Sequence, residues 1–297
     1  MSRAMAAENA LDRTSRAYRY YRNAVERHWD PAEIDLSVDR ERIGELDAAT
    51  FDDLRRTLAL FGAGEEAVTE DLAPLAVVLE GIEDQLYVTT QLYEEAKHTD
   101  FFDRYWREMI LPATDDRGLE RSSPTDERWF FPAYYELFDR NEAAMARLLE
   151  SDAAEDLARA YSHYHLTIEG ILAQTGYYAV QMNYCGETPG LPSLPGLVDA
   201  FTRIRSDEGR HVGFGMAKLK ALVRTESVDI DLIHGTVNDL LPLTQEVART
   251  AAASDEDAGL DEDDLTAYAA EKRLDRMAQL TDANADVSGV EEPVAPE

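Results

Sequence analysis

The sequence predicts an all-α protein built around a four-helix bundle, and three observations lead to this prediction. Apolar residues recur at helical spacing over most of the chain, and no strand-like alternation of weight interrupts them. The 11 prolines are scarce within these stretches. The motif Glu-x-x-His occurs twice, at residues 95–98 and 208–211, which is the spacing by which facing helices of a bundle hold two metal ions.

The helical segments follow one another along the chain. Residues 1–35 are polar with aromatic residues in between, and we expect an N-terminal arm with one helix. The helical domain is expected over residues 36–281. From residue 282 the chain is acidic and poor in large apolar groups, so residues 282–297 are predicted to form a disordered tail. Helical spacing covers residues 50–60, 65–79, 82–111, 133–150, 154–184, 197–223, 230–250 and 265–280.

Glycine, proline and acidic residues mark the expected breaks between these segments. Gly62 and Gly64 are expected to interrupt the helical pattern of their region. Residues 112–128 carry two prolines and are predicted to form a polar connection. Residues 186–196 are expected to form a Gly/Pro loop, and residues 252–264 an acidic, solvated loop.

The chain carries a large excess of negative charge. Its 60 Asp and Glu residues outnumber its 29 Lys and Arg residues, which gives a net charge of −31. Such a surface repels nucleic acid and anionic lipid, so neither is expected as a partner. The acidic balance also favours a halophilic source with a salt-rich cytoplasm, where salt screens like charges from one another.

Three features indicate a cytoplasmic protein without a membrane span. No apolar run approaches the roughly 18 residues that a membrane helix needs. The first residues contain no apolar segment typical of a signal peptide. Cys185 is the single cysteine, so an intramolecular disulfide cannot form. A lone cysteine in a helix-rich segment is typically a small core residue.

The two Glu-x-x-His motifs are candidate metal ligands. Residues three apart share a helix face, so Glu95 can reach the same ion as His98. The same spacing lets Glu208 and His211 reach one ion. Two ions a few ångströms apart need carboxylates that bridge them and imidazoles that complete the coordination.

Two further glutamates in other helical segments, Glu65 and Glu169, complete a set of four carboxylates and two imidazoles. Oxygen and nitrogen donors without thiolate suit iron or manganese better than a structural zinc ion. Spacing leaves two choices open. Glu66 is the neighbour of Glu65, and only one of them can face the core. Glu94 also lies at helical spacing from His98.

Four further residues lie near the motifs, of which two are interpreted as structural and two as candidates for supporting the ligands. His163 and His165 are two apart and point to different sides of a helix, so they are interpreted as structural. Asp207 precedes Glu208 and could accept a hydrogen bond from a ligand imidazole, and Trp29 could join it. The alternative is a solvent-facing Asp207 and a packed Trp29.

Four stretches around these residues carry a resemblance to a known superfamily. They are residues 64–69 (GEEAVT), 94–99 (EEAKHT), 164–170 (YHLTIEG) with 175–178 (TGYY), and 207–211 (DEGRH). They resemble the ribonucleotide-reductase small-subunit superfamily, and within it the ligand-binding oxidases, for which the first two strings are typical. The resemblance implies a ferritin-like bundle with flanking helices, and a homodimer. It also implies one ligand set: Glu65, Glu95, His98, Glu169, Glu208 and His211.

The resemblance further implies a cofactor and a bound ligand. The site is similar to a mixed manganese–iron centre, with two irons as the alternative. In this family a tyrosine five residues before the third-helix glutamate forms an ether cross-link with a valine three residues after the first glutamate. Tyr164 and Val68 stand at those places. The family also carries a long-chain fatty acid on the metals in an apolar channel, and Tyr177 is similar to a position beside it.

Three functions are compatible with these expectations. The first is an oxidase that uses dioxygen for the two-electron oxidation of a hydrophobic ligand. Such an oxidase also needs an electron donor, which the sequence does not identify. The second is a ribonucleoside-diphosphate reductase small subunit. It is disfavoured because Phe102 occupies the place of a common radical tyrosine, and because Tyr268 is the last aromatic residue. The third is an iron-storage bundle, for which the chain is long.

Overall fold

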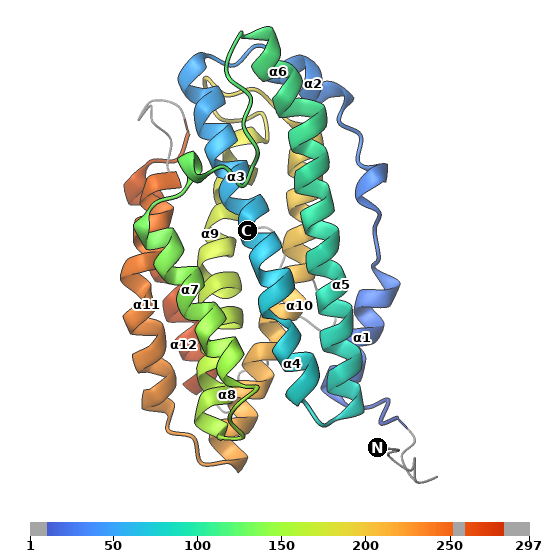
Figure 1. Ribbon diagram of the computed structural model, residues 1–297, viewed down its shortest axis with the longest axis vertical. Helices are drawn as coiled ribbons and strands as arrows, with labels where there is room; N and C mark the ends of the chain where they lie inside the picture. Colours follow the sequence, from blue (N-terminus) through green and yellow to red (C-terminus); the bar gives the residue numbers. More distant parts are fainter. Residues whose placement is uncertain (1–10, 252–258, 282–297) are drawn as a thin grey trace.

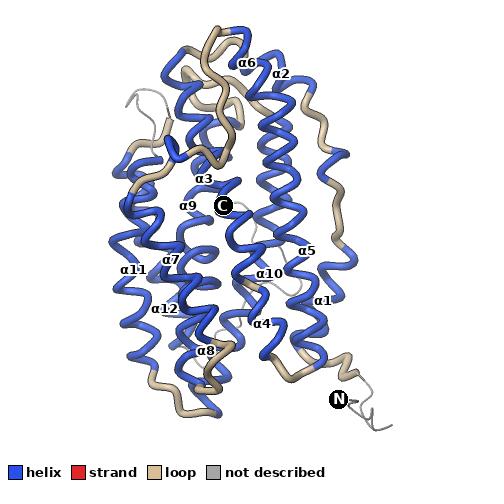
Figure 2. Tube along the Cα trace, viewed as in Figure 1, coloured by secondary structure: helices blue, strands red, loops and turns tan. Residues whose placement is uncertain are grey.

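The computed structural model describes residues 11–251 and 259–281 of the chain. Every regular element in these residues is helical, and the long helices run along the longest axis of the molecule (Figures 1 and 2). The predicted all-α class is therefore confirmed. The predicted tail, residues 282–297, lies outside the described residues. None of the described helices is both long and apolar enough to cross a membrane.

Four long helical stretches form the central bundle. They are α3 (Ala48–Asp71), α5 (Ile82–Tyr105), α10 (Pro195–Thr225), and a composite stretch of α8 (Ala154–Tyr161), the π-helical segment η4 (Ser162–Ala173) and α9 (Gln174–Tyr184). Helix α3 packs on α5, and α10 packs on η4 and α9. The interior between them is where a metal centre of the expected kind would lie.

Further helices flank the bundle, as expected. Helix α1 lies in the N-terminal arm and packs along α5, and α11 and α12 cover η4 on the left of Figure 1. The acidic loop expected to end at residue 264 is shorter, because α12 starts at Glu262. The flanking elements are α1 (Arg16–Glu26), η1 (Pro31–Glu33), α2 (Ser37–Ile43), α4 (Ala73–Val78), η2 (Trp106–Ile110), α6 (Leu111–Asp116), η3 (Glu127–Trp129), α7 (Pro132–Arg147), α11 (Ile230–Ala251) and α12 (Glu262–Thr281).

Carboxylates satisfy the free backbone N–H groups where two bundle helices begin. At the start of α3, the Asp47 side chain accepts a hydrogen bond from the N–H of Thr50 at 2.9 Å. At the start of α10, the buried Asp39 accepts from the N–H groups of Gly196 and Leu197, at 2.9 and 2.8 Å. These contacts fix the start of the helix that carries the second Glu-x-x-His motif.

The expected interruption at Gly62 and Gly64 was wrong, because both lie inside α3. A Cβ atom at Gly62 would lie 3.4 Å from Phe102 Cβ, and one at Gly64 would lie 3.4 Å from Phe138 Cζ. Helix α3 continues through both glycines because α5 and α7 pack against it, and this packing outweighs the low helix propensity of glycine. The chain breaks later instead, where Pro74 occupies the first turn of α4.

Two other expectations were also wrong. The helix expected to end at residue 111 continues through the π-helical η2 and α6 as far as Asp116. Pro112 lies in the first turn of α6, directly after this π-helical turn, and helices commonly adjust in that way around a proline. Cys185, expected in the core, is exposed at the end of α9.

The π-helical segment η4 determines which of its residues share a face. In an α-helix, residues five apart differ by about 140° around the axis. In a π-helix, hydrogen bonds join residues five apart, so such residues lie one above the other. Tyr164 and Glu169 are five apart, and both line the same internal cavity. A single regular helix over residues 154–184, as the sequence predicts, would not place them together.

We expect the substitution G215A to destabilise the protein. Helix α10 approaches η4 so closely that a Cβ atom on Gly215 would lie 2.3 Å from the Cβ of the buried His165. Because the packed histidine must shift, the free energy of unfolding should fall by roughly 1–3 kcal/mol, as measured by chemical denaturation. The matched control is G235A in α11, where no described atom outside the neighbouring backbone of its own helix lies within 4 Å of the added carbon. G235A should raise stability by roughly 0.5–1 kcal/mol, and equal effects of the two changes would contradict the prediction.

Candidate metal centre

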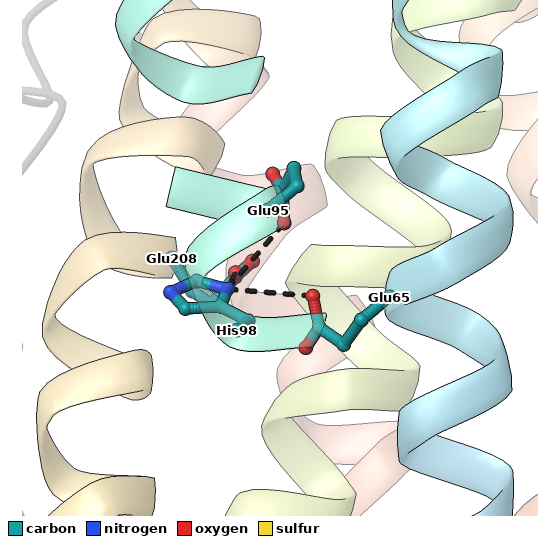
Figure 3. Close-up of side chains that lie close together, drawn as sticks. All are labelled: Glu65, Glu95, His98 and Glu208. Carbon is teal, nitrogen blue, oxygen red and sulfur yellow. Dashed lines mark hydrogen bonds and ion pairs between the residues drawn. The ribbon is translucent and has the colours of Figure 1, made fainter. Parts of the chain in front are cut away.

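All six predicted ligands meet inside the bundle, and all are buried. Helices α3, α5 and α10 and the segment η4 each contribute to the cluster. Figure 3 shows Glu65, Glu95 and Glu208 turned toward His98 from three different helices. The six residues are Glu65 on α3, Glu95 and His98 on α5, Glu169 on η4, and Glu208 and His211 on α10.

The donor atoms of these residues form two overlapping groups of four. Within each group, one donor atom from every residue lies within 4.8 Å of the others. Glu95 and Glu208 belong to both groups, so they are placed to bridge two ions. The groups are Glu65, Glu95, His98 and Glu208, and Glu95, Glu169, Glu208 and His211.

The distances around the two histidines fit shared ions. The Nδ1 atom of His98 lies 3.3 Å from Glu65, 3.5 Å from Glu95 and 3.4 Å from Glu208. The Nδ1 atom of His211 lies 3.0 Å from Glu95 and 3.5 Å from Glu208. Two donors that bind one ion at about 2.1 Å and at right angles lie about 3 Å apart.

Two buried donor atoms of the cluster have no hydrogen-bond partner among the described residues. They are Nδ1 of His211 and Oε2 of Glu169. Nδ1 of His211 is close to carboxylate oxygens, but not in hydrogen-bonding geometry. Buried polar atoms normally have partners, and a metal ion would provide them here. The oxygen and nitrogen donor set suits iron or manganese, so the residues present fit a pair of such ions.

Burial works against negative charge on these carboxylates. It is the main reason why the pKa of Glu65 is raised to about 8. Burial also raises the pKa of Glu169 well above its ordinary value, with repulsion from Glu208 adding to the effect. The pKa of Glu208 is raised as well, again first by burial and then by Glu95. Two divalent cations would remove this conflict by balancing the four carboxylates.

A carboxylate on the far side of each ligand histidine fixes its orientation. Nε2 of His98 lies 3.1 Å from Oδ2 of Asp207, and Nε2 of His211 lies 2.9 Å from Oε2 of Glu94. With the hydrogen on Nε2, each ring turns the Nδ1 lone pair toward a metal position. Trp29 Nε1 donates to Oδ2 of Asp207 at 2.8 Å. Asp207 is therefore buried beside a ligand imidazole with Trp29 bound to it, and does not face solvent.

The structure also separates the two pairs of neighbouring glutamates. Glu65 is buried and belongs to the cluster, whereas Glu66 is exposed. Glu95 faces the metal positions, whereas Glu94 is buried behind them and holds His211.

Sequence reasoning missed three residues that support the cluster. Lys97 Nζ donates to Oδ2 of Asp207 at 2.7 Å, and Gln91 Nε2 donates to Oε1 of Glu169 at 3.0 Å. Arg210 donates to both of the carboxylates that hold the histidines. A signal for it exists in the sequence, because Asp207 and Arg210 repeat the three-residue spacing of the second Glu-x-x-His motif one position earlier.

Tyr164 reaches the cluster from η4. Its hydroxyl donates to Oε1 of Glu95 at 2.8 Å, and both Tyr164 and Val68 line a cavity that the four glutamates of the cluster also line. The neighbouring His163 and His165 stay outside both groups of donors. That placement agrees with their interpretation as structural residues.

The same cavity extends away from the cluster as a channel with largely apolar walls. Along α3 it is lined from Thr50 to Val68, a span of 18 residues or about 27 Å at 1.5 Å per residue. Tyr177 lines it beside Phe61, with ring centroids 5.3 Å apart. At the end far from the cluster the lining includes Asp53, whose side chain is 14% exposed.

Comparison with solved structures shows proteins with the same architecture. Two are variants of R2-like ligand-binding oxidase, one Tyr-to-Phe and one Val-to-Leu, each with an aerobically reconstituted Mn/Fe cofactor. A third is a Gly-to-Leu variant with a non-activated Mn/Mn cofactor. Each has a TM-score of 0.80 and 28% sequence identity, and each match covers 91% of this chain and 95% of the neighbour's chain. These neighbours support a di-metal oxidase with a ferritin-like fold.

The family assignment comes from the sequence as a whole. The model of the family described as ribonucleotide reductase, small chain, matches residues 13–280, which includes all six residues of the cluster. This chain therefore belongs to the ribonucleotide reductase small-chain family.

Proposed function

We propose that this protein is an oxidase that uses dioxygen to oxidise a hydrophobic, fatty-acid-like ligand by two electrons. In the same proposal, Val68 and Tyr164 become joined by an ether cross-link. The observation that carries it is that the four glutamates of the buried carboxylate–histidine cluster lie in the wall of a largely apolar channel. The Mn/Fe cofactors of the structural neighbours support one manganese and one iron ion, with two irons as the alternative.

The shape and charge of the site support a long ligand with an acidic head. The apolar walls favour a hydrocarbon chain, and Tyr177 lies along them. At the cluster, four glutamates balance the charge of two divalent ions. Two trivalent ions would leave positive charge, which a carboxylate head group would offset.

The cross-link balances with dioxygen as the oxidant. When bound, the two ions supply electrons and Lewis acidity for the reduction of dioxygen. The Tyr164 oxygen forms a bond to a side-chain carbon of Val68, and each partner loses one hydrogen. Glu95 accepts the hydrogen bond of the Tyr164 hydroxyl and is placed to take its proton. Full reduction of one dioxygen to two waters takes four electrons and four protons. The cross-link supplies two electrons and two protons, the ions supply one electron each, and solvent supplies the other two protons. Oxidation of the ligand therefore needs a second dioxygen and an external electron donor that first reduces the two ions again.

We expect the chain to lose about 2 Da when the metal-free protein is loaded with manganese and iron and exposed to oxygen. This is the mass of the two hydrogens removed from Val68 and Tyr164, and intact-mass measurement after denaturation detects it. The native mass of the same sample should be higher by that of the bound lipid, which an organic extract identifies. An unchanged denatured mass with both ions bound would argue against the cross-link.

The matched control for this experiment is a second buried tyrosine. Y164F removes the oxygen that forms the bond, so the mass loss should disappear. Tyr161 lies one helical turn earlier and is equally buried, but it does not line the cavity and its hydroxyl has no hydrogen-bond partner among the described residues. Y161F should therefore keep the mass loss.

The second candidate function is a ribonucleotide reductase small subunit, which delivers a radical to a partner. A hydrogen-bonded chain from His98 through Asp207 to Trp29 favours it, because it joins a ligand to the N-terminal arm. Phe102, which stacks on Phe61, occupies the place where a radical tyrosine would be expected. A stable complex with a reductase large subunit, together with an unchanged mass, would favour this candidate.

A further inference from the structure

One buried guanidinium lies behind both metal positions. Arg210 is 2% exposed, and its Nη2 atom donates to Oε1 of Glu94 and to Oδ1 of Asp207. Both carboxylates are themselves 2% exposed, so these contacts are shielded from water. Charge-assisted hydrogen bonds in such surroundings are strong and constrain geometry.

Each of the two carboxylates divides its oxygens between Arg210 and one histidine. Glu94 gives Oε1 to the arginine and Oε2 to Nε2 of His211, at 2.9 Å. Asp207 gives Oδ1 to the arginine and Oδ2 to Nε2 of His98, at 3.1 Å. A continuous chain of contacts through Arg210 therefore joins the two ligand imidazoles from behind.

The two halves of this chain differ in their other partners. Oδ2 of Asp207 also accepts from Lys97 at 2.7 Å and from Trp29 at 2.8 Å. Among the described residues, Arg210 is the single Arg or Lys that forms a salt bridge with Glu94. Loss of Arg210 would leave Asp207 with one cation and Glu94 with none.

We propose that Arg210 is a positioning residue shared by the two metal positions. It holds Glu94 and Asp207, which in turn orient the two histidines, so the metal affinity of both positions depends on it. This inference rests on the proposed function in one respect, since it takes the six clustered residues as metal ligands. Loss of a partner that orients a ligand typically lowers metal affinity about 10–100-fold.

The test is an anaerobic titration of the metal-free chain with Mn(II) alone, in competition with a chelating dye. The natural chain should bind two ions. R210M should lower the Mn(II) affinity of both positions by about 10-fold or more. E94Q should lower the Mn(II) affinity of the His211 position. K97M should lower the affinity of the His98 position only, if it lowers any. Anomalous X-ray scattering at the manganese edge identifies the position that stays filled at one equivalent.

A folded R210M chain that keeps full affinity at either position would overturn the proposal. If R210M does not fold, R210K decides, because it keeps the buried charge but its side chain ends one bond short of the Nη2 atom that contacts both carboxylates. R210K should also weaken both ions, and unchanged affinity at either position contradicts the shared role. A natural chain that fails to bind two Mn(II) ions would instead count against the proposed function itself.

Discussion

The substitution E208A is expected to remove both metal ions from the protein. Glu208 belongs to both groups of donors, so its loss reduces each position from four protein ligands to three. Glu95 would remain as the single bridging carboxylate between two cations. We expect affinity at both positions to fall by more than the roughly 100-fold upper effect of an orienting residue. Metal analysis after gel filtration should find close to no bound metal, and oxygen should then produce no mass loss.

Two further variants make this prediction specific. E65A removes a ligand that belongs to one group only, so it should lower the affinity of the His98 position and leave the other position able to bind. E66A changes the exposed neighbour of that residue and should keep both ions. If E208A and E65A lose the same single ion, Glu208 does not bridge and the two-ion arrangement is wrong.

Ligand residues could be predicted from the sequence because their spacing is local. Glu95 and His98 share a face through three-residue spacing in any α-helix, as do Glu208 and His211. The choice between Glu94 and Glu95 could not be made in this way. Both side chains turn inward, and only the packing of α10 against α5 determines which one faces the metals. The family resemblance made that choice, and in the structure Glu95 belongs to both groups of donors while Glu94 belongs to neither.

The features that sequence reasoning missed depend on contacts between helices. Gly62 was predicted to interrupt the helix because local propensity takes no account of the packing of α5 against α3. The π-helical segment was missed because its hydrogen-bond pattern changes the periodicity that a helical reading assumes. Arg210 was not singled out, because its partners come from two different helices. Each case needed knowledge of which helix lies opposite.

The metal-free protein is expected to lose stability as the pH rises from about 5 to 8. Burial raises the folded-state pKa of Glu65 to about 8, from an ordinary value of 4.5. Between these values the folded chain binds more protons than the unfolded chain, so the free energy of unfolding falls with rising pH. One such group contributes a slope of up to about 1.4 kcal/mol per pH unit. Urea denaturation at fixed salt with a chelator present measures this slope.

The variant E65Q tests the cause, because glutamine cannot ionise and should flatten the slope in this window. Residual slope is expected from the ligand histidines. Burial alone would lower the pKa of His98, but Glu65 and the other carboxylates around it raise it well above its ordinary value. Its stabilising charge is therefore lost as the pH rises, which also lowers the free energy of unfolding.

Metal loading should reverse the sign of the slope of the free energy of unfolding against pH, since ions bind the deprotonated ligands and favour higher pH. Parallel slopes with and without metal would mean that these six side chains do not bind the ions.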